Sequence, residues 1–377
     1  MTRASRSLGI LLCAFAVAAH ADITIGVTLS ATGPAASLGI PEKNTIALMP
    51  TTIAGEKLKY VVLDDATDPT AASKNARKLA TEDKVDVIIG SSTTPTCIAV
   101  LEVAAETKTP QIALAPFAPA MDKVSWVFMT PQPFGLMASA ITEHMSANGV
   151  KSVGFIGYSD PYGELWLREF SRLAPLKGIR LLATERYNRT DTSVTGQILK
   201  LLAATPDAVL VVGSGTPAAL PQVTLVERGY KGRIYQTHGV ANNDFLRVGG
   251  KNLEGAVLPI GPVLVPEQLP DSNPSKKAAL EYVKAYEGAH GAGSRSTFGA
   301  HTWDAGLLLQ RAVPEALKKA RPGTAEFRAA LRDALENVKE LAATHGVFTY
   351  SATDHVGLDS RAVVMVRVEN GTWKLMH

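Results

Sequence analysis

Residues 85–96 read VDVIIGSSTTPT, and this stretch decides the fold. An apolar, β-branched run ends at Ile89, and Gly90 and four hydroxyl residues follow it. Thr94 is suited to cap a helix and Pro95 to occupy its first position, and a helical pattern begins at Thr96. The stretch therefore predicts a buried strand, a short loop and a helix in direct succession.

The same succession recurs along most of the chain. Amphipathic stretches separate the apolar runs; one of them places Ala72, Ala76 and Leu79 on one face, and Asp68 can cap it. Such alternation predicts parallel sheets that helices cover on both faces. The other apolar runs are residues 23–29, 59–63, 111–115, 152–156, 180–184, 208–212 and 233–236.

Two prolines within residues 130–133 divide the alternation into two series, because proline stops regular structure. The chain also exceeds the length that one core usually organises. We therefore expect an α/β protein with two doubly wound parallel-sheet lobes. After a last helical stretch (325–340), the runs 346–350 and 362–368 predict a closing strand pair with a turn at Asn370-Gly371.

The first 21 residues have the pattern of a secretory leader. Arg3 and Arg6 precede an apolar run, and residues 19–21 match the small-x-small site of a signal peptidase. Cleavage removes two of the 38 basic residues and none of the 35 acidic ones, which leaves 356 residues with a formal charge of +1. We expect an exported protein without a surface for nucleic acid and without membrane insertion. Cys97 alone remains, as a core residue, so no disulfide forms within the chain.

The loops after the apolar runs are the candidate site, since open α/β sheets bind ligands beyond the carboxyl ends of their strands. Ser91, Ser92, Thr93 and Thr94 bring hydroxyls and N–H groups to one helix start, which is suited to a carboxylate. An ordinary helix cap explains the same residues.

Aromatic residues make up 6% of the chain, so those in strand-end loops are informative. Tyr158 and Tyr162 lie in one such loop, and Phe117 follows Ala115 in another. We expect them to face a ligand, with plain packing as the alternative for each.

Residues 213–218 read GSGTPA and match the G-x-G-x-x-A pattern of a dinucleotide site. Such a site needs an acid about 20 residues later, and residues 234–238 contain none. A tight turn explains the pattern better; we expect no cofactor, and Gly215 and Thr216 remain candidates for ligand contact. P-loop, G-x-S-x-G and H-E-x-x-H motifs are absent and the histidines lack metal-ligand spacing, so we expect no catalytic and no metal residues.

Several stretches together resemble the type I periplasmic solute-binding proteins of ABC transporters, in the branched-chain amino acid (Leu/Ile/Val) binding family. They occur in the family's order and cover nearly the whole mature chain. The stretches are residues 23–27 (ITIGV), 32–34 (TGP), 64–69 (DDATDP), 87–92 (VIIGSS), 110–112 (PQI), 162–163 (YG) and 239–240 (GV).

The resemblance implies two lobes that three crossovers join and that close over a solute. The first lobe would comprise residues 22–131 and 259–344, and the second 132–258 and 345–377. In the family, the loop corresponding to Ser91 to Thr94 and the next strand-end loop, Ala115 to Phe117, hold the ligand carboxylate. The family's second-lobe tyrosine corresponds to Tyr162.

One departure from the family bears on the ligand. Amino-acid binders of the family place an acid after a second-lobe strand to hold the ligand's ammonium group, and His238 occupies that position here. An imidazole is a poor partner for ammonium but can hydrogen-bond a hydroxyl, a carbonyl or an anion. Leu38 replaces an aromatic residue of the family. The candidate loops (91–94, 115–118, 158–163, 213–217 and 236–243) contain no Lys or Arg and one acid, Asp160, too little positive charge for phosphate, sulfate or a dicarboxylate.

The chain also resembles the subset of this family that binds aromatic acids, such as benzoate derivatives and phenylpropenoids. We therefore expect a monomeric, non-catalytic periplasmic component that delivers an aromatic monocarboxylate to an inner-membrane ABC permease, with His238 at the far end of the ring. A branched-chain or other apolar amino acid is the alternative, because Asp160 or Asp244 can still pair with ammonium. An exported enzyme would need a nucleophile-base pair, and a cytoplasmic sensor of this fold would lack a leader.

Overall fold

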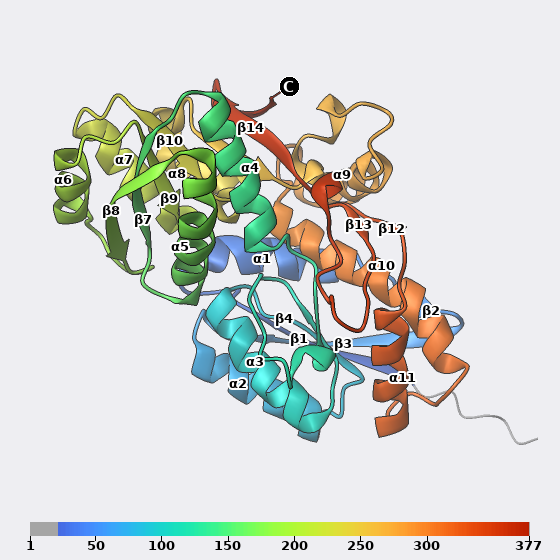
Figure 1. Cartoon of the computed structure of the whole chain (residues 1–377). Coiled ribbons are helices and arrows are strands. Elements are labelled where there is room, and N and C mark those ends of the chain that lie inside the picture. The colour runs from blue at the N-terminus through green and yellow to red at the C-terminus, as the bar shows by residue number, and fades with distance from the viewer. Residues whose placement is uncertain (1–21, 377) are drawn as a thin grey trace, which may run out of the picture.

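The computed structural model describes residues 22–376, and the expected leader lies outside this range. The chain forms two α/β lobes, each built on its own sheet (Figure 1). The fold class expected from the sequence is confirmed.

The first lobe contains a six-stranded sheet in the order β2-β3-β1-β4-β5-β6, parallel except for the β2-β3 hairpin. Both faces of β4 are buried: Ile89 packs with α10 and α11, and Ile88 with α2 and α3. A continuous apolar run is what such a strand requires. The elements are β1 (Ile23–Leu29), α1 (Ala36–Ile46), β2 (Thr52–Ile53), β3 (Glu56–Asp64), α2 (Pro69–Arg77), β4 (Val87–Gly90), α3 (Thr94–Thr107), β5 (Gln111–Ala113), β6 (Val127–Met129), α9 (Lys276–His290), α10 (Thr297–Leu317) and α11 (Ala325–Glu336).

The second lobe contains a seven-stranded sheet in the order β15-β14-β11-β10-β9-β7-β8. The strands from β7 to β11 are parallel, and β14 and β15 add an antiparallel edge. Its elements are α4 (Phe134–Ala147), β7 (Ser152–Tyr158), α5 (Pro161–Leu173), β8 (Arg180–Tyr187), α6 (Thr195–Ala203), β9 (Ala208–Val212), α7 (Ala219–Glu227), β10 (Arg233–Gln236), α8 (Asn243–Gly249), β11 (Val257–Ile260), β14 (Val364–Glu369) and β15 (Thr372–Leu375).

Side-chain caps fix where the helices next to the strand ends begin. Asp68 accepts a hydrogen bond from the Ala71 N–H (2.7 Å) at the start of α2. Thr93, rather than Thr94, caps α3 in a capping box with Thr96, and Asp160 caps α5. These caps fix the ends of the loops that connect β3 to α2, β4 to α3 and β7 to α5.

The eight apolar runs all form strands, but the end of the chain differs from the prediction. The closing pair is β14 with β15 around Asn370-Gly371, whereas β13 (Val347–Phe348) pairs with β12 (Leu341–Ala342). Phe348 and Tyr350 pack in the core of the first lobe, so the expected change of lobe at residue 345 is wrong for this segment. The expected change at 258/259 falls inside β11, which lies wholly in the second sheet.

Three crossovers run side by side between the lobes. Gln132, in the first crossover, donates a hydrogen bond from Nε2 to the Ala362 carbonyl (3.1 Å) in the third. A Cβ added to Gly261, just after β11, would lie 2.7 Å from Gln132 Nε2 and 2.5 Å from His345 Cδ2. The crossovers are therefore packed too closely for a side chain at Gly261.

Candidate ligand-binding site

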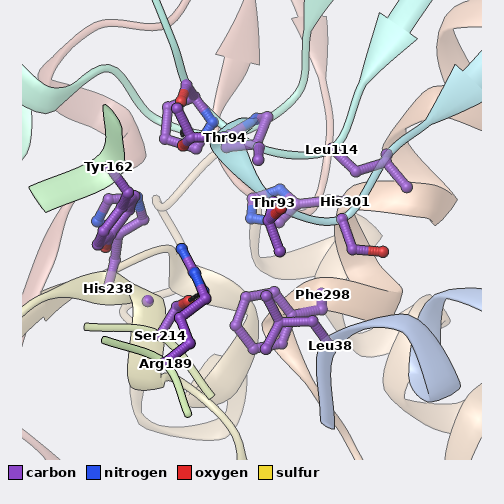
Figure 2. A pocket seen from close by; sticks show the side chains of 15 residues that line it. Leu38, Thr93, Thr94, Leu114, Tyr162, Arg189, Ser214, His238, Phe298 and His301 are labelled. Atoms are coloured by element: carbon purple, nitrogen blue, oxygen red, sulfur yellow. Dashed lines mark hydrogen bonds between the residues drawn. The ribbon is translucent and has the colours of Figure 1, made fainter. Parts of the chain in front are cut away.

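A cavity lies between the lobes, and residues of both lobes line it (Figure 2). Leu38 of α1, the loop from Ser92 to Thr94 and the segment 114–116 contribute from the first lobe, together with Phe298 and His301 of α10. The second lobe contributes residues from the loops after β7, β8, β9 and β10. These residues are Tyr162, Arg189, Ser214, His238 and Gly239.

The structure places seven of the twelve expected site residues on the cavity wall and five behind it. Ser91 donates to buried Asp65 (2.5 Å), and Phe117 packs in an apolar cluster against α3. Tyr158 lies beneath Arg189, and Gly215 and Thr216 contact α1. The residues on the wall are Leu38, Ser92, Thr93, Thr94, Ala115, Tyr162 and His238.

The hydroxyl groups at the start of α3 already have partners inside the first lobe. Thr94 Oγ1 donates to the Pro116 carbonyl (2.7 Å), and Thr93 Oγ1 accepts from the Thr96 N–H (3.4 Å). Ser92 Oγ accepts from the Ser30 N–H (2.9 Å) and contacts the Glu42 carboxyl group. This helix start therefore offers a ligand fewer free donors than the sequence suggested.

Two buried acids support this loop from behind. Burial raises the pKa of Glu42 well above its usual range, and its Oε1 has no partner among the described residues. Burial also raises the pKa of Asp65, although hydrogen bonds from Ser91, Ser30 and Thr28 oppose this effect. Glu42 therefore favours the neutral acid, and the loop brings no full negative charge to the wall from that position.

Two neutral imidazoles face the cavity. His238 follows β10, and burial lowers its pKa to about 3. His301 is stacked on His345 with ring centroids 3.7 Å apart, and burial lowers its pKa well below the usual value. Nδ1 of His238 and Nδ1 of His301 are buried without a hydrogen-bond partner in the part of the chain that the structure describes. Each ring can therefore donate or accept a hydrogen bond without bringing a charge.

Arg189 also lines the cavity, although it was not among the expected site residues, and it brings a positive charge to the wall. Its Nε donates to Asp160 Oδ2 (2.7 Å), its Nη1 donates to Ser214 Oγ (2.7 Å), and its Cζ lies 4.2 Å from the centre of the Tyr158 ring. The five loops counted from the sequence contain no Lys or Arg, but the loop after β8 was not among them, so the expectation of a pocket without a basic residue is wrong. Arg189 stands two residues after β8. The rule that open α/β sheets bind ligands beyond the carboxyl ends of their strands, called the strand-end rule below, could therefore have found it.

Other missed residues carried no comparable signal. Phe298 and His301 belong to α10, far along the chain from the strand-end loops. Pro116 lies inside the expected loop Ala115 to Phe117, Leu114 lies inside the expected run 111–115, and Ser214 and Gly239 lie in expected loops. Pro131 lies in the expected boundary between the two series.

The described residues show no arrangement typical of a metal centre. Within residues 22–376 no group of three His, Cys, Asp or Glu side chains is placed to hold a metal ion. Cys97 is fully buried, donates to the Ser91 carbonyl (3.0 Å), and has its pKa raised by burial. The expectation that Cys97 is a core residue is confirmed.

A cavity that lies between two α/β lobes and is lined by both is the architecture of a solute-binding protein. The chain belongs to the periplasmic binding protein family, whose model matches residues 22–372. Proteins of this family bind small molecules and work with ABC permeases. No helix within residues 22–376 is both long and apolar enough to cross a membrane.

Individual relatives agree with this assignment. An extracellular ligand-binding receptor from Rhodopseudomonas palustris is 49% identical, with a TM-score of 0.93 over 95% of this chain and 100% of that one. The Leu/Ile/Val-binding protein homolog 3 of Brucella melitensis is 24% identical over 90% of each chain. A solute-binding protein of an ABC transporter from Rhodopseudomonas palustris, in complex with 3,4-dihydroxybenzoic acid, shares the fold at 21% identity, with a TM-score of 0.78 over 93% of this chain and 95% of that one.

Proposed function

We propose that this protein is the periplasmic component of an ABC importer and captures a small aromatic monocarboxylate of the benzoate or phenylpropenoid type. Its task is binding and delivery, without a catalytic step. The observation that carries the proposal is the second-lobe wall, where neutral His238 and cationic Arg189 stand instead of an acid. A wall of this charge favours an anion and disfavours an ammonium group.

The rest of the wall suits a flat apolar body. Leu38, Leu114, Phe298 and Pro116 supply apolar surface, and the neutral imidazole of His301 can hydrogen-bond a ring hydroxyl. The complex of a structural neighbour with 3,4-dihydroxybenzoic acid shows that this fold can hold such an acid, which supports the proposal.

Closure of the cleft would couple binding to transport. A solute held by one lobe gains the contacts of the other lobe only when the lobes meet, so it shifts the equilibrium toward the closed form. The permease would then distinguish loaded from empty protein by shape.

A branched-chain amino acid is the second candidate, because the Brucella relative is named as a Leu/Ile/Val-binding protein homolog. The two acids that could pair with its ammonium group are already engaged. Asp160 binds Arg189 and two N–H groups of α5, and Asp244 pairs with Arg247 (3.0 Å) and does not line the cavity.

Thermal-shift and calorimetric screening of purified residues 22–377 tests the proposal. The panel contains benzoate, 4-hydroxybenzoate, 3,4-dihydroxybenzoate and 4-coumarate, with leucine, isoleucine and valine as the competing class. A ligand at about 100 times its Kd stabilises the folded state by about 2.7 kcal/mol, which raises the melting temperature by several degrees. We expect this shift from aromatic acids. A shift from leucine or valine alone would refute the aromatic assignment.

A further inference from the structure

The cavity wall contains one side chain that is charged near neutral pH. Burial keeps His238 and His301 neutral, and it raises the pKa of the Tyr162 phenol. The remaining wall residues other than Arg189 are apolar, hydroxyl-bearing or glycine. Among the residues that line the cavity, a solute therefore meets one charged group, the guanidinium of Arg189.

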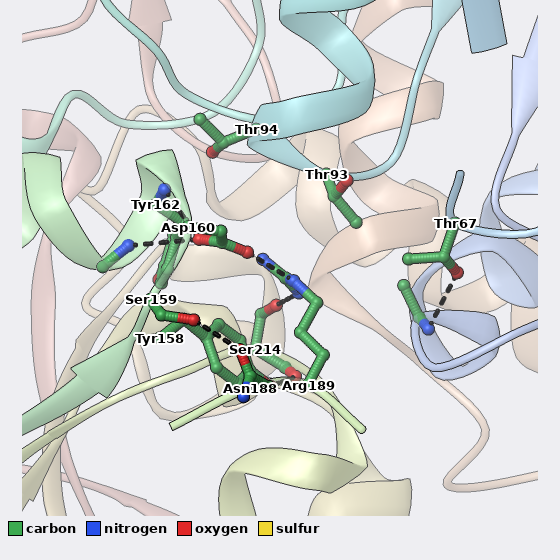
Figure 3. A network of polar contacts seen from close by, with 12 residues as sticks. Thr67, Thr93, Thr94, Tyr158, Ser159, Asp160, Tyr162, Asn188, Arg189 and Ser214 are labelled. Carbon is green, nitrogen blue, oxygen red and sulfur yellow. Dashed lines mark hydrogen bonds and ion pairs between the residues drawn. The ribbon is translucent and has the colours of Figure 1, made fainter. Parts of the chain in front are cut away.

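Asp160 neutralises this charge only in part. Its Oδ1 accepts hydrogen bonds from the N–H groups of Tyr162 (2.9 Å) and Gly163 (3.3 Å), at the positive end of α5, and only Oδ2 accepts from Arg189. Figure 3 shows this line of polar contacts from the start of α5 through Asp160 and Arg189 to Ser214. The carboxylate is shared between a helix terminus and the guanidinium, so it compensates the charge of Arg189 less than a carboxylate bound to the guanidinium alone would.

The guanidinium is also held in one orientation. Nε and Nη1 are fixed by Asp160 and Ser214, and the Tyr158 ring supports the plane from one side. The hydrogen bonds of Arg189 to other described residues use Nε and Nη1, so Nη2 has no such partner. The side chain is 12% exposed, and its end points into the space between Tyr162, Thr94 and Phe298 (Figure 2). A rigid guanidinium with an open N–H edge is suited to bind a carboxylate.

We propose that Arg189, in the second lobe, binds the carboxylate of the solute. The start of α3 would then receive the neutral end, since its hydroxyls already have partners in the first lobe. This assignment reverses the orientation that the family resemblance implies. The proposal rests on the proposed function only for the aromatic body of the ligand. The role of Arg189 as the anchor, meaning the residue that binds the carboxylate, requires only that the ligand has a carboxylate.

The test compares four affinities, those of a charged and a neutral ligand for the wild type and for a variant of Arg189. Calorimetry measures the binding of 4-hydroxybenzoate and its neutral amide, 4-hydroxybenzamide, to the wild type and to Arg189→Met. We expect the wild type to prefer the acid by about 10- to 100-fold, the range of a charge-assisted hydrogen bond, and this preference to fall below about threefold in the variant. Equal weakening of acid and amide in Arg189→Met, with the preference kept, would overturn the anchor and leave Arg189 a packing role.

Controls separate the anchor from folding and from ligand class. Arg186→Met removes an exposed arginine of β8 that pairs with Glu164, and it should leave both affinities unchanged. If Arg189→Met does not fold, the double variant Asp160→Asn with Arg189→Gln takes its place, because it removes both charges and leaves neither unpaired. This double variant should show the same loss of preference for the acid over the amide.

If only leucine binds the wild type, leucine and leucinamide replace the aromatic acid and amide. A lost preference for leucine in the variant then supports the anchor and refutes the aromatic ligand, whereas a kept preference overturns both. Failure of every carboxylate in the panel to bind folded wild type also overturns both.

Discussion

Gly215 marks the place where the closed lobes touch, and a methyl group there should act on closure. It follows β9 with φ +64°, and an added Cβ would lie 2.6 Å from Ser37 Oγ and 2.7 Å from Leu38 Cδ1. Both partners belong to α1 of the first lobe, and Ser37 Oγ also accepts a hydrogen bond from the Thr216 N–H (3.2 Å). Gly215→Ala therefore places an atom where the opposite lobe must fit.

The free-energy cost of Gly215→Ala has two parts, one that affects folding and one that affects ligand binding. Gly215 has φ +64° and ψ −161°, a backbone conformation that essentially only glycine adopts and that costs alanine about 1–3 kcal/mol. This cost applies whether the lobes are open or closed, so it lowers only the free energy of unfolding. The overlap with Ser37 and Leu38 exists only in the closed form. Overpacking costs about 1–3 kcal/mol, which includes turning Ser37 away from Thr216. We expect the Kd to rise by about 5- to 150-fold, the equivalent of that range.

Calorimetry with the best ligand of the panel measures this effect, and small-angle scattering checks that ligand no longer compacts the variant. Gly149→Ala is the matched control, because Gly149 has φ +75° in the second lobe and an added Cβ meets nothing within 4 Å. It should lower the melting temperature and leave the Kd unchanged. An unchanged Kd in Gly215→Ala would show that the lobes need not meet at α1 during binding and would refute the reasoning.

Three further predictions concern buried titratable groups. His238→Glu should abolish aromatic-acid binding in calorimetry, because it places an acid on the wall that the ligand carboxylate shares; unchanged affinity would show that His238 does not contact the ligand. The unfolded chain protonates His238 near pH 6.5 and the folded chain only near pH 3, so the histidine should remove at most about 1.4 kcal/mol of stability per unit as the pH falls through this window; urea unfolding at pH 7 and pH 5 should show a smaller loss in His238→Gln than in the wild type. Glu42 has the opposite sign, since a raised carboxyl pKa costs stability as the pH rises above its usual value of 4.5; Glu42→Gln should therefore melt at a higher temperature than the wild type at pH 8 and lose this advantage near pH 4, and an equal difference at both pH values would contradict the assignment.

The fold could be predicted because its decisive signals are local. The run that ends at Ile89 is apolar on both faces, and Thr93, Pro95 and Thr96 define the helix start within a few residues. Strand β11 was missed because Pro259 stands inside it, and β6 was missed because no α-helix separates it from β5. The path of residues 345–358 was missed because Phe348 and Tyr350 join a core that other parts of the chain build.

The site could be predicted only as far as the strand-end rule was applied. That rule leads to Tyr162 and His238, and it also leads to Arg189, whose loop was left out of the count. It cannot lead to Phe298 or His301, because helix α10 reaches the cavity through tertiary packing. Nor does the sequence show that the hydroxyl of Thr94 has a partner, since the Pro116 carbonyl lies 22 residues away along the chain.

The contacts of His301 bear on how Arg189 and His238 of the second lobe approach a solute when the cleft closes. His301 lines the cavity and stacks on His345, which lies against Gly261 in the second crossover. Asp304, one turn further along α10, accepts hydrogen bonds from the N–H groups of Thr344 (2.8 Å) and His345 (3.1 Å), so the segment is fixed to the first lobe. Motion at the hinge must then occur between this fixed segment and the second lobe. The loops of that lobe start from one sheet, so we expect them to move as a single body, and closure should bring the cation and the imidazole to the solute in one step.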